Sequence, residues 1–296
     1  MPDQAAGVIH DLGYRRYDGP RLGRASIVRA LTWHSFRSAW GIGRGVKAKI
    51  IPILALVAIC LPAFVNAFAV ARGNARLFGY DVYTPAFRVI VVTIFLAAQA
   101  PELVSRDLRS KVLPLYFSRP LNRRDYPLAK YAALTGALLV LIELPLLILY
   151  VGTIASAKNG HGVWAETKAL IPGLGMGVLW AVLMAAIGLV LASLTGRRAY
   201  ATGIVAITCF LSWTLASLLI QVEGGTSATS TGARLGGLLS PFTVIDGVRI
   251  WLGGTNQGLD PGNLGHYGPL YGVVAVLMLA ASLGGLAARY RKASEQ

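Results

Sequence analysis

Charged residues and chemically reactive side chains are scarce in this chain. Of its 296 residues, only 14% are Asp, Glu, Lys or Arg, whereas an ordinary soluble domain has about 25%. There are two cysteines and four histidines, and no GxxxxGK(S/T), HExxH or CxxC motif. We therefore expect no catalytic group, no metal site and no cofactor on this chain, and we do not expect an enzyme. Any energy-requiring activity would depend on another polypeptide or on an ion pathway.

Apolar residues, by contrast, form long runs. They make up 55% of the chain, and its mean hydropathy is +0.58. Six runs approach the roughly 20 residues that a helix needs to cross a hydrocarbon core about 30 Å thick. The runs lack the period-two alternation of membrane-spanning strands. We predict an all-α membrane protein with six transmembrane helices, at about 50–70, 86–104, 129–151, 170–194, 200–221 and 268–288.

Basic residues are distributed unequally between the two sides of such a membrane domain. The segments 1–49, 102–130, 195–199 and 289–296 would share one side, and they hold 21 of the 28 Lys and Arg residues. Because basic flanks stay in the cytoplasm, we expect both termini to be cytoplasmic, the C-terminus as a short tail over 289–296. The net charge of +15 then reflects topology and contact with anionic membrane lipid, so we expect no nucleic-acid binding.

The basic cytoplasmic arm over residues 1–49 ends in a helical pattern. Trp33, Phe36 and Trp40 follow at i, i+3 and i+7, which places them on one side of a helix. Aromatic rings with flanking arginines suit the headgroup layer, so we expect an interfacial helix anchored by these three side chains. The alternative is an ordinary surface helix packed on protein.

The longest loop, residues 222–267, would lie on the outer side. Its first part is rich in Gly, Ser and Thr and predicts irregular structure. Residues 240–254 place apolar side chains at helical spacing, so we expect a short amphipathic helix at the outer interface, or a re-entrant one. The loop cannot build the apolar core of a soluble domain.

Three polar side chains fall within the predicted spans. Glu143 lies in the outer half of the third span, Arg88 near the outer start of the second, and Asn66 in the first. Charged groups inside a bilayer are costly and are usually paired or functional. This leaves an Arg88–Glu143 ion pair, a role of Glu143 in a substrate pathway, or a span boundary that leaves Glu143 at lipid or water. Asn66 is expected to hydrogen-bond a neighbouring helix.

The segment between the second and third spans is unusually rich in charge. Residues 101–130 hold seven Lys or Arg and three acids among apolar residues, and 102–113 has the pattern of a helix that continues past the membrane. This mixture predicts a docking surface for a protein partner; an element held only by anionic lipid is the alternative. The candidate contact residues are Glu102, Arg106, Asp107, Arg109 and Lys111, with Arg119 and Arg123 at the rim.

The same segment resembles the loop after the second span of the ABC type-2 permease family. That family's pattern is an acid, a basic-acidic helix, an R-P-L-(x)-R stretch and then a lysine. In PELVSRDLRSKVLPLYFSRPLNRRDYPLAKY these are Glu102, Arg106–Asp107, Arg119–Pro120–Leu121 with Arg123 or Arg124, and Lys130. The arm IHDLGYRRYDGPRLGR resembles the N-terminus of actinobacterial members, and six spans with an SPF-containing outer segment agree. The outer loop of this chain is rich in glycine and has no cysteine, which is a difference in emphasis from the family.

The resemblance implies a multi-pass permease subunit in a bacterial plasma membrane. It would pair with a second permease subunit, identical or related, on two copies of a separate ABC ATPase subunit that bind ATP and Mg. Residues 102–127 would form the coupling segment, with its helix seated in a cleft of the ATPase. The complex would export an amphipathic substrate, such as a lipid, drug, antibiotic or peptide.

Two other functions are compatible with the residues. An ion-coupled secondary carrier would use Glu143 and work without any ATPase. A non-transporting membrane scaffold or sensor subunit would bind a partner without changing the partner's turnover.

Overall fold

Helices are the only regular secondary structure in the part of the chain that the structure describes. The computed structural model describes residues 19, 22–73, 80, 85–109, 122, 124–156, 160–223, 230–254, 261 and 264–293. The α-helices are α1 (Arg24–Ala39), α2 (Val46–Ala71), α3 (Pro85–Arg109), α5 (Asp125–Ala155), α6 (Gly160–Ser193), α7 (Arg198–Val222), α8 (Thr231–Gly236), α9 (Pro241–Trp251) and α10 (Gly268–Ala293). Two 3-10 turns, η2 (Gly237–Leu239) and η3 (Gly265–Tyr267), flank α9 in the sequence.

Six of these helices are long and apolar enough to cross a membrane: α2, α3, α5, α6, α7 and α10. This confirms the prediction of a multi-pass all-α membrane protein. The longest, α6, has 34 residues, which corresponds to about 51 Å at 1.5 Å per residue. Since a hydrocarbon core is about 30 Å thick, α6 extends well beyond the apolar layer.

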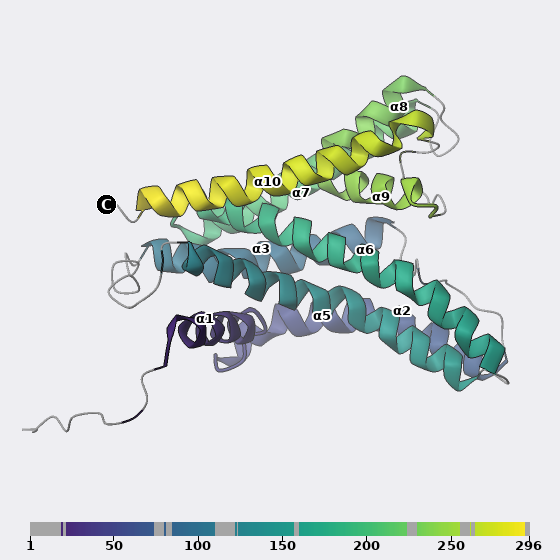
Figure 1. The fold of residues 1–296 in the computed structure, drawn as a ribbon, viewed down its shortest axis with the longest axis horizontal. Helices are drawn as coiled ribbons and strands as arrows, with labels where there is room; N and C mark the ends of the chain where they lie inside the picture. Colours follow the sequence, from purple (N-terminus) through teal and green to yellow (C-terminus); the bar gives the residue numbers. More distant parts are fainter. Residues whose placement is uncertain are drawn as a thin grey trace, which may run out of the picture.

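The ends of the bundle differ in what lies there (Figure 1). The helix α1 and the C-terminal part of α10 lie at one end, here named the α1 end, and α8 and α9 lie at the opposite end, named the α9 end. In Figure 1, α1 is seen nearly end-on, so it runs across the long axis of the other helices and packs against α5 and α3.

The second span, α3, is the centre of the bundle. Of its apolar window, 78% is buried, compared with 28% for α2, 28% for α7 and 22% for α10. The helices at the periphery of the bundle instead expose leucine, isoleucine, valine and phenylalanine, for example Leu54, Phe64 and Phe68 of α2. Such surfaces suit contact with lipid tails or with another apolar helix.

Small residues allow the helices to approach closely. At the contact of α2 and α5, a Cβ added to Gly152 would lie 2.3 Å from the Cβ of Ala67 and 3.0 Å from its Cα. At the contact of α3 and α6, a Cβ on Gly188 would lie 2.5 Å from a methyl group of Leu96. Both glycines therefore set the distance between neighbouring helices, as small residues commonly do in membrane bundles.

The short helix expected within 240–254 is present as α9, but it is more buried than an interfacial helix would be. Ser240 caps it by accepting a hydrogen bond from the Phe242 backbone N–H at 3.3 Å. Every residue from Pro241 to Arg249 is buried, because α9 packs against α6, α7 and α10. A Cβ on Gly247 would lie 2.2 Å from the ring of Tyr271, so the glycine permits this close packing. The helix is thus part of the bundle interior at the α9 end.

Candidate functional site

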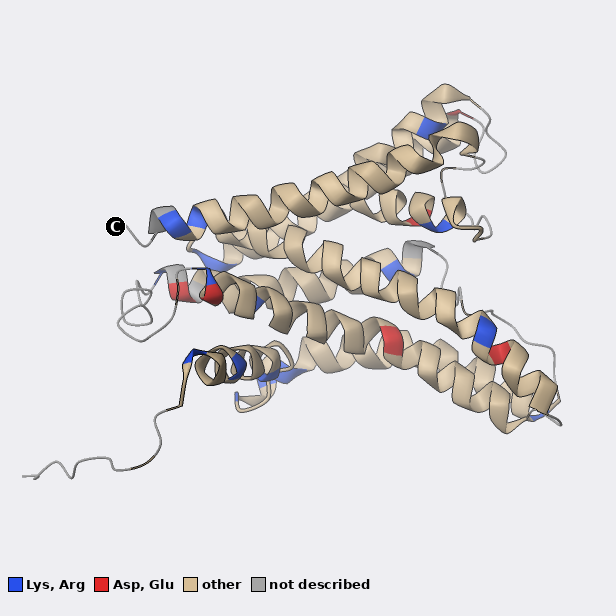
Figure 2. Cartoon of the chain, in the orientation of Figure 1, with Lys and Arg blue, Asp and Glu red and all other residues tan. Residues whose placement is uncertain are grey.

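Charged side chains gather towards the ends of the helices, with few along their middle (Figure 2). Those at the α1 end include the described part of the predicted coupling segment. Those at the α9 end include Arg88 and Asp246. The charged group at the α1 end belongs to the candidate docking region, and the group at the α9 end lies beside a cavity.

The first ion-pair cluster at the α1 end is centred on Glu102, near the end of α3. Its Oε1 lies 2.7 Å from Nη2 of Arg44, and its Oε2 lies 2.9 Å from Nη1 of Arg198. The Glu102 side chain is only 5% exposed. The carboxylate therefore connects α3 both to the turn before α2 and to the first residue of α7.

A second cluster lies less than two helical turns further along α3. The carboxylate of Asp107 accepts a hydrogen bond from the Tyr126 hydroxyl and lies 2.9 Å from Nζ of Lys130. The ring of Tyr126 packs against that of Tyr290, with 5.3 Å between centroids. Asp107 thus ties α3 to the start of α5, and the tyrosine pair continues the contact to α10.

A third pair joins α1 to α5. Nε and Nη2 of Arg24 donate to the two carboxylate oxygens of Asp125 at 2.7 and 2.6 Å, a bidentate arrangement. The Asn122 backbone N–H donates to Asp125 at 3.0 Å. The hydrogen bonds with Asp125 also raise the pKa of the Arg24 guanidinium above its ordinary value, so the arginine stays charged at any pH of interest.

Of the seven predicted coupling residues, the structure describes the side chains of three: Glu102, Asp107 and Arg109. Glu102 and Asp107 are engaged within the chain, whereas Arg109 is exposed at the last position of α3. Its backbone lies beside the turn between α6 and α7, 3.7 Å from a Cβ added to Gly196. The side chain of Arg106, and all of Lys111, Arg119 and Arg123, lie outside the described residues. The helix predicted over 102–113 is described as far as Arg109.

Sequence reasoning missed the partners of these carboxylates. Arg44, Arg198 and Arg24 come from three loops or helix starts that are distant in sequence from α3 and α5. Their basic character was visible as a topology signal, and no local pattern could indicate which acid each would meet. Tyr126 lies at the start of an apolar run, where no local pattern indicates that it would hydrogen-bond Asp107.

The predicted anchor residues of α1 have three different environments. Trp33 is 61% exposed and stacks on Phe36, with 5.5 Å between centroids. Phe36 is partly buried and packs on the bundle core beside Gly136. Trp40 also packs inward, 5.4 Å from the ring of Phe95 in α3. Only Trp33 is therefore placed to reach a headgroup layer, and the other two rings hold α1 on the protein.

Arg88 and Glu143 do not form the ion pair that was one of the three alternatives for Glu143. Nη2 of Arg88 lies 2.8 Å from Oδ1 of Asp246 in α9, and its guanidinium stacks over the ring of Trp180 at 4.5 Å. Arg249 approaches the same carboxylate oxygen, with 3.7 Å between Nε and Oδ1. The sequence places Asp246 in an outer loop, and only the packing of α9 into the bundle brings it to Arg88.

Glu143 remains a buried carboxyl group within α5. Neither of its oxygens has a hydrogen-bond donor among the described residues. The group lies against α6, where a Cβ added to Gly177 would be 2.1 Å from Oε1. The third predicted polar residue, Asn66, is fully buried in α2.

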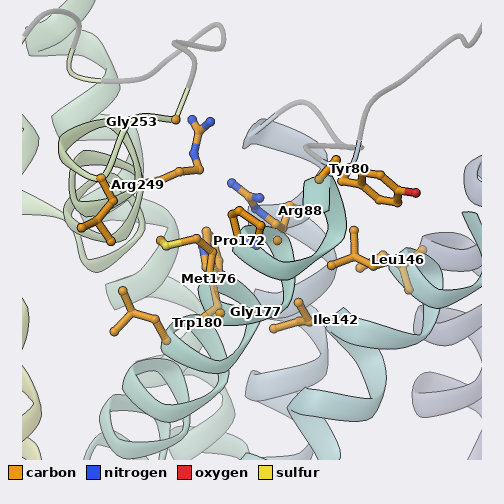
Figure 3. Close-up of a pocket in the computed structure, with 17 residues that line it drawn as sticks. Tyr80, Arg88, Ile142, Leu146, Pro172, Met176, Gly177, Trp180, Arg249 and Gly253 are labelled. Atoms are coloured by element: carbon orange, nitrogen blue, oxygen red, sulfur yellow. The ribbon is translucent and has the colours of Figure 1, made fainter. Parts of the chain in front are cut away.

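A cavity of about 670 Å³ opens at the α9 end, between α2, α3, α5, α6 and α9 (Figure 3). Its walls are mostly apolar, with the rings of Tyr80 and Trp180 among them. The charged groups of its described lining are Arg88 and Arg249. Figure 3 shows these two side chains reaching from opposite sides towards the same space. On the other side of Arg88, the Tyr80 hydroxyl points away from the two arginines (Figure 3) and donates to Glu166 at 2.7 Å.

The described residues contain no group of three His, Cys, Asp or Glu side chains that could hold a metal ion. Chemically, the two ends differ: the α1 end has paired charges and several exposed arginines, Arg109 among them, and the α9 end has an apolar cavity with two guanidinium groups. Comparison with known proteins adds no assignment, because no protein-family model and no curated protein sequence matches the chain.

Proposed function

We propose that this chain is the membrane-spanning permease subunit of an ATP-driven exporter, with ATP hydrolysed on a separate ATPase subunit. The proposal combines the resemblance of residues 101–130 to the ABC type-2 permease loop with six candidate spans. The sequence has no phosphate loop of its own, which is compatible with ATP hydrolysis on a separate subunit. The pair of permease subunits would sit on two ATPase subunits in a bacterial plasma membrane, with both termini of this chain in the cytoplasm.

The observation that carries the proposal is the way α3 leaves the apolar layer. The helix is apolar over most of its length and ends in the charged residues Arg106, Asp107 and Arg109. Glu102, about one turn before this charged end, binds Arg44 and Arg198, and Asp107 within it binds Lys130. A displacement of the coupling segment would therefore pull on the start of α2, α5 and α7 together.

The residues of the segment divide into two roles under this proposal. Glu102 and Asp107 are positioning residues, because their carboxylates form ion pairs with other residues of the same chain. Arg109 is an exposed contact residue, and Arg106, Lys111, Arg119 and Arg123 are proposed to bind the ATPase with it. Arginine suits this role because its guanidinium forms directional hydrogen bonds with carboxylates of a partner.

Movement would pass from the ATPase to the outer half of the bundle through α3. Binding of ATP favours one arrangement of the ATPase subunits, and the coupling segment moves with them. Because α3 is the most enclosed of the spans, its displacement shifts the helices that surround it. The amphipathic substrate would then move between two permease subunits, each rocking against the other.

The decisive experiment is purification of the complex from its native gene neighbourhood, followed by mass spectrometry and ATPase assays. We expect a stoichiometric partner with a phosphate loop, whose ATPase turnover changes when this chain is present. Arg109→Glu should reduce binding of that partner, whereas Arg37→Glu, an exposed arginine on α1, serves as the matched control. A chain that purifies alone and still transports would overturn the proposal.

One observation favours a second candidate, an ion-coupled carrier. The buried carboxyl oxygens of Glu143 have no hydrogen-bond donor among the described residues, and such groups in membrane spans are often proton or ion sites. A carrier of this kind would need no ATPase, and proton flux through the purified chain would depend on Glu143.

A further inference from the structure

We propose that the cavity at the α9 end binds an anionic amphiphile, meaning a molecule with one carboxylate or phosphate head and an aliphatic chain. The proposal does not rest on an ATPase partner, because the cavity is built within a single chain. It concerns the occupant of this cavity, whether that molecule is carried or bound as a lipid.

Arg88 and Arg249 would bind the head of the ligand. One comes from the start of α3 and the other from the end of α9, and both guanidinium groups line the cavity. Their common contact with Asp246, at 2.8 and 3.7 Å, holds them in place before a ligand arrives. Planar guanidinium groups match the paired oxygens of carboxylates and phosphates, so the polar part of the cavity favours an anion.

The rest of the lining would contact the aliphatic chain of the ligand. The side chains of Ile59, Ile142, Leu146, Met176 and Leu179 contribute apolar walls from α2, α5 and α6. The volume of about 670 Å³ falls in the range of roughly 300–1,000 Å³ that is usual for small-molecule sites. Methionine adapts its shape to irregular guests, which suits an aliphatic chain of variable length.

Other kinds of occupant fit less well. A purely apolar guest would desolvate the guanidinium groups without offering them an acceptor, and Nε of Arg88 already lacks an acceptor among the described residues. A cation would be repelled by the net positive charge that Arg88 and Arg249 keep beside the single carboxylate of Asp246. A small polar anion would leave the apolar walls in contact with water. An amphiphile satisfies both parts of the cavity.

The test uses the full chain in phosphatidylcholine nanodiscs with 9,10-dibromostearate as probe, whose bromines quench nearby tryptophan fluorescence. We expect saturable quenching that Trp180→Phe largely removes, because Trp180 lines the cavity. Dibromostearyl alcohol, which has the same chain without the charge, should give no saturable component. Unbrominated palmitate and lysophosphatidate added as competitors show whether the preferred head is a carboxylate or a phosphate.

Two variants separate the head from the chain. Arg249→Gln leaves the Arg88–Asp246 pair in place and should weaken stearate binding by roughly tenfold or more, the size of a lost charge-assisted hydrogen bond; Arg249→Lys should restore most of it. Gly175→Phe should block binding, since Gly175 lines the cavity and has no atom within 4 Å of an added Cβ. The matched control is Gly284→Phe, an equally open glycine of α10.

Several results would overturn the proposal. One is equal quenching by the acid and the alcohol, and another is an unchanged affinity in Gly175→Phe. A third is displacement by neither competitor. If Arg249→Gln does not fold, as judged by circular dichroism, the comparison of Gly175→Phe with Gly284→Phe decides alone.

Discussion

Arg88 of α3 and Asp246 of α9 form an ion pair, with 2.8 Å between Nη2 and Oδ1, where the side chains are 17% and 3% exposed. The pair holds the short helix α9 against the most enclosed span of the bundle. It also places Arg249 and Arg88 at the same cavity. At the α9 end, the Asp246 carboxylate therefore lies close to both cavity arginines.

Replacing that carboxylate should destabilise the α9 end. Asp246→Asn removes the negative charge from between two arginines that are largely buried. Breaking a buried ion pair by removing one partner costs about 3–5 kcal/mol, because the remaining charge stays uncompensated. We expect a lower midpoint of thermal unfolding in detergent and faster proteolysis near α9. Asp246→Glu is the control, and an unchanged midpoint in Asp246→Asn would contradict the importance of this pair.

The two arginines on Glu102 should contribute unequally to stability. The Arg44 side chain is 25% exposed and that of Arg198 is 59% exposed, so solvent screens the second pair more strongly. We expect Arg44→Gln to cost about 1–3 kcal/mol and Arg198→Gln well under about 1 kcal/mol. A double-mutant cycle with Glu102→Gln measures each coupling directly. Equal coupling energies would show that both pairs are solvated alike.

The contact between α2 and α5 should depend on a single glycine. Gly152→Ala places a methyl group 2.3 Å from the Cβ of Ala67, and the nearby Cα belongs to backbone that cannot move without shifting a helix. Overpacking of this kind costs about 1–3 kcal/mol. Gly136→Ala in the same helix is the control, since its new Cβ meets only the Phe36 ring at 3.5 Å. Thermal unfolding of both variants checks the prediction, which fails if the two midpoints shift equally.

Neutralising Glu143 should separate the two candidate functions. In an ATP-driven exporter, Glu143→Gln should retain ATPase stimulation and unfold at a higher temperature, because the buried charge is removed. Proteoliposomes that contain a pH-sensitive dye and this chain, without any ATPase, test the alternative. We expect the wild-type chain and Glu143→Gln to give the same proton flux. Flux that disappears in Glu143→Gln would instead establish the ion-coupled carrier.

The sequence by itself determined the six spans and the helical class. Runs of apolar residues near the length of a bilayer core allow few other structures, because every backbone polar group must be satisfied within the span. The helix within 240–254 and the continuation of the second span past the apolar layer were also predictable. Both follow from periodicity along one stretch of chain, which needs no knowledge of neighbouring elements.

Only the tertiary structure decided which charges meet. Arg88 pairs with Asp246 rather than Glu143 because α9 packs inside the bundle, and the pair is separated by 158 residues in sequence. Glu102 likewise meets Arg44 and Arg198 because three helix ends converge at one place. Charge pairing depends on distances of a few ångströms between side chains, and hydrophobic periodicity carries no information about them.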